Sequence, residues 1–181
     1  PGDTFTISAD TTLYAQYVTY TVGDTGPGGG VVFHDKGNYT NGWRYMEAPS
    51  TDQGQAQFGG TGTHFGTDTN TGYGIGKTNT ETLTTQSSST TAAELCYDHT
   101  QNGYMDWFLP AKSTVNELYV QKQNGIIGGF AGGSRHWSST EYDDVNLDLA
   151  WASGLDGSNN VNNYSKTRGN SNVYVRCVRR F

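Results

Sequence analysis

The sequence predicts an α+β domain built from short strands, helices and long loops. Its 181 residues include 25 Gly and 12 Tyr, and only 33% are hydrophobic, a composition that favours turns and strands over long helices. The run VYVRC at 173–177 alternates in polarity, as a half-buried strand does. Val115, Leu118 and Tyr119 instead follow the i, i+3, i+4 spacing of one helix face. The chain is long enough for one sizeable core.

Hydrophobic periodicity separates the expected strands from the expected helices along the chain. Strands are predicted where apolar residues alternate or form short runs: 31–33, 42–49, 145–151 and 173–177, with a short buried strand or turn at 106–110. Helices are predicted at 111–123 and, from a weaker pattern, at 79–86 and 90–99. Residues 50–77 are rich in Gly and Thr without a period and are predicted to form a loop.

The same patterns predict which side chains point into the core. One strand face is expected to carry Val145, Leu147, Leu149 and Trp151. One helix face is expected to carry Ala92, Ala93, Cys96 and Tyr97. In the last strand, Val173, Val175 and Cys177 share a face. Both cysteines are therefore expected to point inward.

The chain has two cysteines, which are too few for a zinc site with its four closely paired ligands. Cys96 and Cys177 are either two unrelated buried thiols or one long-range disulfide of an exported protein. The composition, typical of surface proteins, favours the disulfide.

Charge and hydropathy exclude two classes of partner. The net charge of −6 argues against nucleic acid, which requires a basic face. No apolar run approaches the roughly 20 residues of a membrane helix, so no direct membrane insertion is expected. From its opening PGDTF, we expect the chain to lack a signal peptide and to be a mature fragment of a longer protein.

Residues 1–17 are expected to form a short hairpin separate from the main domain at 18–181. The strings GDTFT and LYAQY resemble the closing segment of the Listeria–Bacteroides surface repeat, with Tyr17 where that repeat usually has Trp. This resemblance implies that bacterial surface repeats precede the domain.

Four strings in order carry a second resemblance, over about residues 20–181: VGDTGPGGGVVF, AAELCYDHTQNGYMDWFLP followed by NELY, HWSSTE, and YVRCVRRF. Together they resemble the C-terminal domain family of the Legionella collagen-like adhesin. The resemblance implies a C-type-lectin-like fold of small twisted, mostly antiparallel sheets with two main helices and long loops. It also implies a disulfide from a helix to the last strand, which Cys96 and Cys177 would form. Ala111 replaces the Ser that often caps the following helix, so the cap is expected to shift to Ser113 or to be lost.

The fold implied by this resemblance also hosts receptors that retroelements diversify near the C-terminus. Residues 134–136, 143–148 and 156–172 are rich in Asn, Ser, Asp, Tyr, Gly and Arg, as such a variable surface would be. The alternative is that these Asn and Gly residues simply form turns. Both explanations stay open at this point.

The implied function is non-catalytic binding at an extracellular bacterial cell surface, to a protein or glycan ligand on another cell or in the matrix. The candidate ligand-binding residues are Arg135, His136, Tyr142, Asp143, Asp144, Asn146, Asp148, Asp156, Asn159, Asn160, Asn162, Tyr164, Lys166, Arg168, Asn170 and Asn172. Because Tyr and Arg dominate interface hot spots, Tyr142, Tyr164, Arg135 and Arg168 are the foremost contacts. Trp137, Trp151 and the two cysteines are expected to hold this face in place.

No metal or cofactor is expected. Asp144, Asn146 and Asp148 have the spacing of a calcium loop, but Leu149 and Leu155 stand where such a loop needs Gly and Glu. Strand alternation explains the spacing better. The WND-like and EPN- or QPD-like strings of calcium-dependent lectins are missing. A single Ca²⁺ on Glu141, Asp143 or Asp144 is the weaker alternative.

We expect no enzyme activity. His34, His64, His99 and His136 are scattered without a metal-binding or paired spacing. His99 lies near Cys96, but a disulfide to the last strand explains that cysteine better than a nucleophile does. The WSST residues at 137–140 are expected to satisfy backbone groups beside a buried Trp137. Two alternatives remain: a structural cap of a repeat stalk without a ligand, and an enzyme of the formylglycine-generating type.

Overall fold

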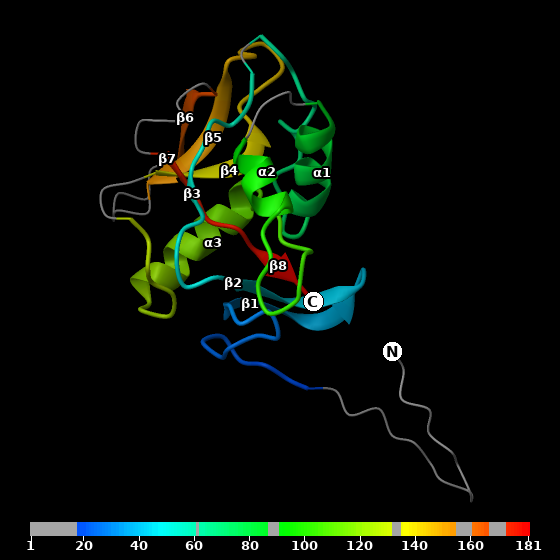
Figure 1. The fold of residues 1–181 in the computed structure, drawn as a ribbon, viewed down its shortest axis with the longest axis vertical. Helices are drawn as coiled ribbons and strands as arrows, with labels where there is room; N and C mark the ends of the chain where they lie inside the picture. The colour runs from blue at the N-terminus through cyan, green and yellow to red at the C-terminus, as the bar shows by residue number, and fades with distance from the viewer. Residues whose placement is uncertain (1–17, 61, 87–90, 132–134, 155–160, 167–172) are drawn as a thin grey trace, which may run out of the picture.

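A computed structural model describes residues 18–60, 62–86, 91–131, 135–154, 161–166 and 173–181. Within these residues the chain forms an α+β fold with three helices and two mostly antiparallel sheets (Figure 1). The predicted hairpin at 1–17 lies outside the described residues.

The smaller sheet contains β1 (Val31–Thr40), β2 (Trp43–Ala48) and β8 (Arg179–Arg180), in the order β1-β2-β8 and all antiparallel. β1 extends well beyond the predicted run at 31–33. A two-residue turn explains the extension, because Asn41 and Gly42 have φ of 52° and 77° and join the paired residues Thr40 and Trp43. An Asn-Gly turn of this kind matches the twist of the strands that it connects.

The larger sheet has the order β3-β7-β4-β5-β6. Its strands are β3 (Gly54–Gln55), β4 (Arg135–Glu141), β5 (Leu149–Gly154), β6 (Val161–Ser165) and β7 (Val173–Val175). β4 and β7 are parallel, whereas the other pairs are antiparallel. The region predicted to be a loop at 50–77 is largely irregular, apart from β3 and the start of α1.

Three helices pack on these sheets, at the three places that the sequence pattern predicted, whereas the resemblance implied two main helices. They are α1 (Gly76–Gln86), α2 (Ala92–Tyr97) and α3 (Lys112–Gln123). α1 and α2 contact the larger sheet, and α3 lies between the two sheets, touching β1, β4 and β5 (Figure 1).

The start of α3 shows what replaces the missing Ser cap. Ala111 is the N-cap residue and makes no side-chain hydrogen bond, so the side-chain cap is lost rather than shifted. The first free N–H groups instead find tertiary partners: Lys112 N donates to Thr140 Oγ1 (3.1 Å) and Ser113 N to Thr71 O (2.9 Å). Helix-end donors that lack a local acceptor are satisfied here by distant segments.

The glycine-rich string before β1 wraps a buried carboxylate. Gly28 N and Gly30 N donate to the two carboxylate oxygens of Glu47, each at 2.9 Å. A Cβ on Gly28 would lie 2.8 Å from Glu47 Oε1, so only glycine allows this approach. Arg179 neutralises the same carboxylate at 2.8 Å. The string is therefore a structural turn that covers the smaller sheet.

Two core clusters meet at the predicted buried segment 106–110. Trp107 packs in the cluster that contains Trp137 and both cysteines, whereas Phe108 packs in the cluster around Phe33. Phe108 also forms an antiparallel bridge with Val178. The prediction of a short buried strand or turn here is confirmed.

The disulfide between Cys96 and Cys177 is present, with a Cα–Cα distance of 5.2 Å, and both side chains are fully buried. It joins Cys96 in α2 to Cys177, which lies two residues after the end of β7. The inward direction predicted for both cysteines is confirmed. The sequence separation of 81 residues corresponds to a stabilisation of about 4.5 kcal/mol on the chain-entropy model. Tyr97, predicted to share the buried face, is 54% exposed because α2 ends there.

The strand predicted at 145–151 is wrong in its first half. β5 begins only at Leu149, and Val145 is 80% exposed. Asp143 Oδ1 accepts hydrogen bonds from Val145 N (3.0 Å) and Asn146 N (2.5 Å), which folds the chain into a turn. A short carboxylate that binds nearby backbone N–H groups competes with strand pairing, and here it prevails.

The predicted inward face of β5 is also wrong. Ala150 and Ala152 are fully buried, whereas Leu149 and Trp151 are only half-buried. Ala152 is paired with Trp137 of β4, whose indole fills this part of the core. Because a large side chain already occupies the space, small residues face it, and Trp151 points to the other side of the sheet.

Candidate functional site

A buried ion pair lies at the base of the predicted binding face. Glu141 is the last residue of β4, and Lys166 directly follows β6. Lys166 Nζ donates to Glu141 Oε1 at 2.5 Å, and neither side chain has exposed surface. Because buried charges are stable only when paired and hydrogen-bonded, this pair holds the ends of β4 and β6 together.

The loop before α1 completes the partners of this pair. Phe65 N and Thr67 N each donate to the Glu141 carboxylate at 3.0 Å. Lys166 Nζ also donates to Thr63 O at 2.7 Å. The pair therefore joins three segments that are far apart in the sequence.

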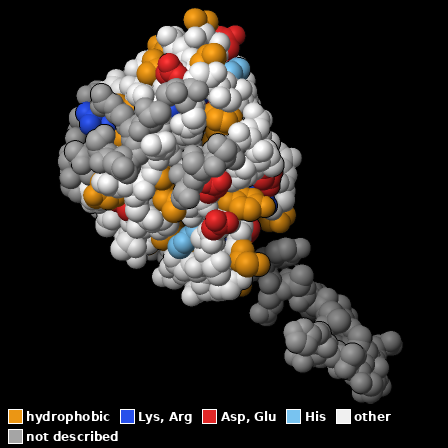
Figure 2. Space-filling model, turned by 45° about the horizontal axis from the view of Figure 1, so that its top comes forward, with side chains coloured by type: hydrophobic (Ala, Val, Ile, Leu, Met, Phe, Trp, Pro, Cys, Tyr) orange, Lys and Arg blue, Asp and Glu red, His pale blue; other side chains and the backbone are white. Residues whose placement is uncertain are grey.

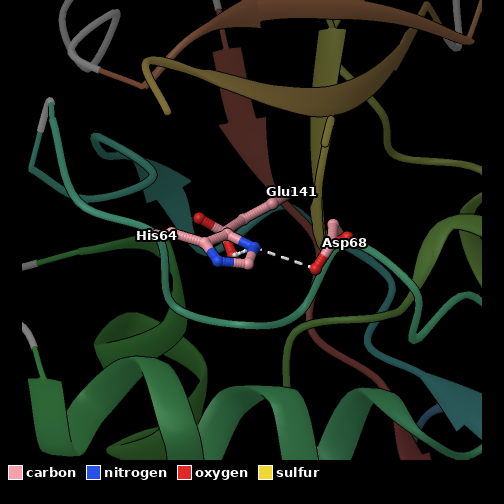
Figure 3. Close-up of side chains that lie close together, drawn as sticks. All are labelled: His64, Asp68 and Glu141. Atoms are coloured by element: carbon pink, nitrogen blue, oxygen red, sulfur yellow. Dashed lines mark hydrogen bonds and ion pairs between the residues drawn. The ribbon is translucent and has the colours of Figure 1, made fainter. Parts of the chain in front are cut away.

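His64 and Asp68 approach the same carboxylate from that loop, and Figure 3 shows the three side chains converging. His64 Nε2 lies 2.9 Å from Asp68 Oδ1 and 3.7 Å from Glu141 Oε2. One potential ligand atom from each residue lies within 4.8 Å of the others, a distance that would suit a metal ion. Sequence spacing did not reveal this cluster, because Glu141 is distant along the chain.

The contacts of this cluster favour a structural role in holding the loop to β4 over the binding of a metal ion. Lys166 and the backbone N–H groups of Phe65 and Thr67 already occupy the carboxylate oxygens of Glu141. A cation bound there would also lie beside the ammonium group of Lys166, and the side chains of Lys166 and Glu141 have no exposed surface.

A second buried charge cluster holds the other end of β4. Arg176 has no exposed surface and donates to Asp52 Oδ1 (2.8 Å) and to the carbonyls of Pro49, Gly128 and Gly129. His136 Nε2 lies 3.0 Å from Asp52 Oδ1, without regular hydrogen-bond geometry.

The protonation of this second cluster follows from its burial. Burial opposes ionisation of Asp52, but the contact with the His136 ring and the charge of Arg176 outweigh it, so the pKa of Asp52 is lowered. Burial also lowers the pKa of His136, which is therefore neutral at pH 7. β4 is thus held near both ends by buried polar clusters.

The WSST string of β4 satisfies backbone groups, as predicted. Ser138 Oγ donates to Trp151 O (3.0 Å), and Thr140 Oγ1 donates to Asn70 O (3.0 Å). Asn79 of α1 donates to Ser139 Oγ (3.1 Å). Trp137 is fully buried, as expected.

Tyr142, Trp151 and Lys112 form a half-buried group on one face of the larger sheet. The rings of Tyr142 and Trp151 have centroids 5.0 Å apart, and Lys112 Nζ lies 3.3 Å from the centroid of the Trp151 ring. Burial lowers the pKa of Lys112. Trp151 was predicted to be a core support.

Arg135 and Tyr164 form a second group on the opposite face of the sheet. Arg135 Nε donates to the Tyr164 hydroxyl, and its guanidinium carbon lies 4.6 Å from the ring centroid. Tyr164 pairs with Ala150, whereas Trp151 pairs with Asn163, so Tyr164 and Trp151 point to opposite faces. The predicted residues therefore do not share one continuous face.

The acidic residues between β4 and β5 form a turn stabilised by their own side chains. Asp143 accepts from Asn146 Nδ2 (2.8 Å) as well as from the backbone, and the hydrogen bond from Asn146 N is the main cause of its lowered pKa. Asp148 Oδ1 accepts from Gly62 N at 2.6 Å. Asp144 is exposed beside them, and Asn162 is exposed on β6.

Two predicted binding residues are corrected by their burial. His136 is 1% exposed and Lys166 is fully buried, so they support the surface from beneath and do not lie on it. Six more predicted residues lie outside the described residues: Asp156, Asn159, Asn160, Arg168, Asn170 and Asn172.

Acidic side chains are spread over the molecular face in Figure 2, where few Lys and Arg side chains are visible. This distribution agrees with the net charge of −6. Among the described residues, no helix is both long and apolar enough to cross a membrane. No family model matches the chain, and no curated protein or solved structure matches it.

Proposed function

We propose that residues 18–181 form a non-catalytic binding domain with a C-type-lectin-like fold, displayed at an extracellular bacterial surface. Its ligand is a protein or glycan on another cell or in the matrix. The observation that carries the proposal is the half-buried group of Tyr142, Trp151 and Lys112, presented by a sheet that buried charge clusters hold in place.

The rigidity of this support favours binding. A surface that is already ordered loses little conformational entropy when it meets a ligand. Tyr and Trp add large amphipathic contact areas and dominate interface hot spots. Tyr142 follows Glu141 directly, so the buried ion pair positions it.

The charge around this group sets the class of ligand. Asp143 and Asp144 lie in the turn that follows Tyr142, and Asp144 is exposed. Together with the net charge of −6, they repel polyanions. A neutral glycan or a protein surface with basic groups fits this environment best.

Two observations favour this function over its alternatives. The Cys96–Cys177 disulfide removes the thiols that a formylglycine-generating mechanism would use. A stalk cap requires only a polar outer surface, whereas here Val145 is 80% exposed and Trp151 is only half-buried.

The test compares Trp151→Ala and Tyr142→Ala with the wild type on a printed array of neutral glycans and matrix proteins. Val120→Ala is the matched control, because Val120 is a 38% exposed apolar residue on the outside of α3. We expect the two aromatic variants to lose at least tenfold in affinity, equal to about 1.4 kcal/mol, with melting temperatures within a few degrees of wild type.

Two outcomes would overturn the proposal. If the wild type captures nothing on the array, the stalk cap is favoured. If folded Trp151→Ala and Tyr142→Ala bind as well as Val120→Ala, the binding surface lies elsewhere. Comparison of sibling gene copies tests the diversification hypothesis, which requires variation concentrated at 134–136, 143–148 and 156–172, with the buried Lys166 the exception in the last range, while Glu141 stays constant.

A further inference from the structure

A cavity of about 550 Å³ opens beside the smaller sheet, and none of the residues predicted to bind a ligand lines it. Its walls come from β1, the Asn41 turn, β2, β8 and the segment just before α1. The volume falls in the range of small-molecule sites, about 300–1,000 Å³. The lining residues used below are His34, Lys36, Trp43, Tyr73, Gly74 and Arg180.

Two cations converge on this cavity, and each is held by a backbone carbonyl. Lys36 Nζ donates to Thr40 O at 2.6 Å and lies 3.8 Å from the centroid of the Trp43 ring. Arg180 Nη1 donates to Gly74 O at 2.7 Å. Within the described part of the chain, neither cation forms an ion pair with a carboxylate. The pKa of Lys36 is lowered by burial and by the charge of Arg180.

One carboxylate, that of Asp35, lines the cavity, a second, that of Glu117, contacts Tyr73 of its wall, and other groups hold both. Asp35 accepts two hydrogen bonds from Arg44, at 2.8 and 2.9 Å. Glu117 accepts from the Tyr73 hydroxyl (3.3 Å) and from Gln121 (2.8 Å). The cavity therefore keeps an excess of positive charge, which is unusual in a chain with a net charge of −6.

The uncharged part of the wall is aromatic. The rings of His34 and Tyr73 stack with centroids 4.5 Å apart and an angle of 8° between their planes. Burial lowers the pKa of His34, so the imidazole is neutral at pH 7 and can donate or accept a hydrogen bond.

Gly74 closes the wall at the guanidinium. It has a φ of +76°, and a Cβ there would lie 2.9 Å from Trp43 Cζ2 and 3.1 Å from Arg180 Nη1. Glycine therefore lets the backbone approach and position Arg180. One donor of Arg180 is used in this contact, and the guanidinium has further N–H groups for a ligand.

We propose that this cavity binds a small organic oxyanion, with Lys36 and Arg180 on the oxyanion and the His34–Tyr73 pair against its uncharged part. Lys acts as a compact positive charge and Arg offers a planar set of donors that matches carboxylate, sulfate or phosphate. The site shares no residue with the Tyr142–Trp151–Lys112 group, although Tyr73 and Lys112 both line a neighbouring cavity, so the two proposals are tested by different variants.

Titration calorimetry at fixed ionic strength tests the proposal with three probes: glucuronate, inorganic sulfate and the neutral sugar glucose. We expect saturable binding of glucuronate, weaker binding of sulfate and none of glucose. Lys36→Gln and Arg180→Gln should each weaken glucuronate binding at least tenfold. Lys77→Gln is the matched control, since it removes the same charge from a residue that lines a different cavity.

The outcomes separate the two parts of the site. Absence of saturable binding by the wild type up to about 10 mM of each anion, weaker than about −2.7 kcal/mol, would overturn the proposal. Equal losses in Lys77→Gln and Lys36→Gln would also overturn it, because they would reveal only general attraction. Equal affinity for sulfate and glucuronate would remove the assigned role of His34 and Tyr73. Lys36→Gln keeps the test valid if Arg180→Gln does not fold, since Lys36 is only partly buried.

Discussion

Lys166 Nζ lies 2.5 Å from Glu141 Oε1, and neither side chain has any exposed surface. The two residues are 25 positions apart in the sequence, at the ends of β4 and β6. This contact holds the end of β4 in place, directly before Tyr142, the next residue of the predicted binding region.

Lys166→Met is expected to destabilise the fold by roughly 3–5 kcal/mol, because it leaves the Glu141 carboxylate buried without its cation. The double variant with Glu141→Gln should recover part of this loss. Arg44→Gln is the matched control. It breaks the partly exposed pair with Asp35, with side-chain exposures of 31% and 26%, and should cost about 1 kcal/mol or less. Urea unfolding measures all three, and equal losses at the two pairs would contradict the interpretation.

Acidification from pH 7 to pH 5 is expected to lower the free energy of unfolding. The pKa of His136 is below 6.5 in the folded state because of burial, so the unfolded chain binds a proton first as pH falls. The pKa values of His34 and His99 are lowered for the same main reason and act in the same direction. Each histidine contributes at most about 1.4 kcal/mol per pH unit.

His136→Gln isolates the buried histidine in this experiment. The variant should show a shallower loss of stability between pH 7 and pH 5 than the wild type, in denaturant titrations at each pH. The carboxyl of Asp52 affects stability at a lower pH, because its pKa is depressed below 3.8 in the folded state. Its stabilising effect is present above pH 3.8 and is lost as pH falls through the folded-state pKa. An unchanged slope in His136→Gln would show that this ring titrates normally.

Trp137→Ala and Trp151→Ala are expected to separate stability from binding. Trp137 is fully buried and its indole donates to Ala56 O at 2.9 Å, so its truncation should cost roughly 3–5 kcal/mol. Trp151 is half-buried and should cost less. Thermal melts of both variants decide this, and a larger loss in Trp151→Ala would restore the original prediction of a core support.

Removal of divalent cations by EDTA is expected to leave the melting temperature unchanged. Lys166 Nζ and the N–H groups of Phe65 and Thr67 already engage the Glu141 carboxylate beside His64 and Asp68. Asp143 is engaged by its own turn. A drop of several degrees on chelation that Ca²⁺ or Zn²⁺ reverses would instead assign a metal to the His64–Asp68–Glu141 cluster.

Local pattern was sufficient for several elements. The i, i+3, i+4 spacing located α3, whose Val115 and Leu118 are buried. The phases of Cys96 and Cys177 predicted that both point inward, and the disulfide confirms it. The Asn41–Gly42 turn was not predicted, although Asn-Gly between two strands is a hairpin signal, and the first strand was therefore predicted too short.

The chain by itself determined the α+β class, the main helices and the inward cysteines, because periodicity and turn chemistry act over a few neighbouring residues. Tertiary structure alone decided which face of β5 is covered, since alternation is the same for either face and only the indole of Trp137 places Ala152 inside. Tertiary structure also decided that Lys166 and Arg176 are buried, although a sequence pattern predicts that charged residues are exposed. Their burial depends on carboxylates 25 and 124 positions away, and a local pattern carries no information about partners at that distance.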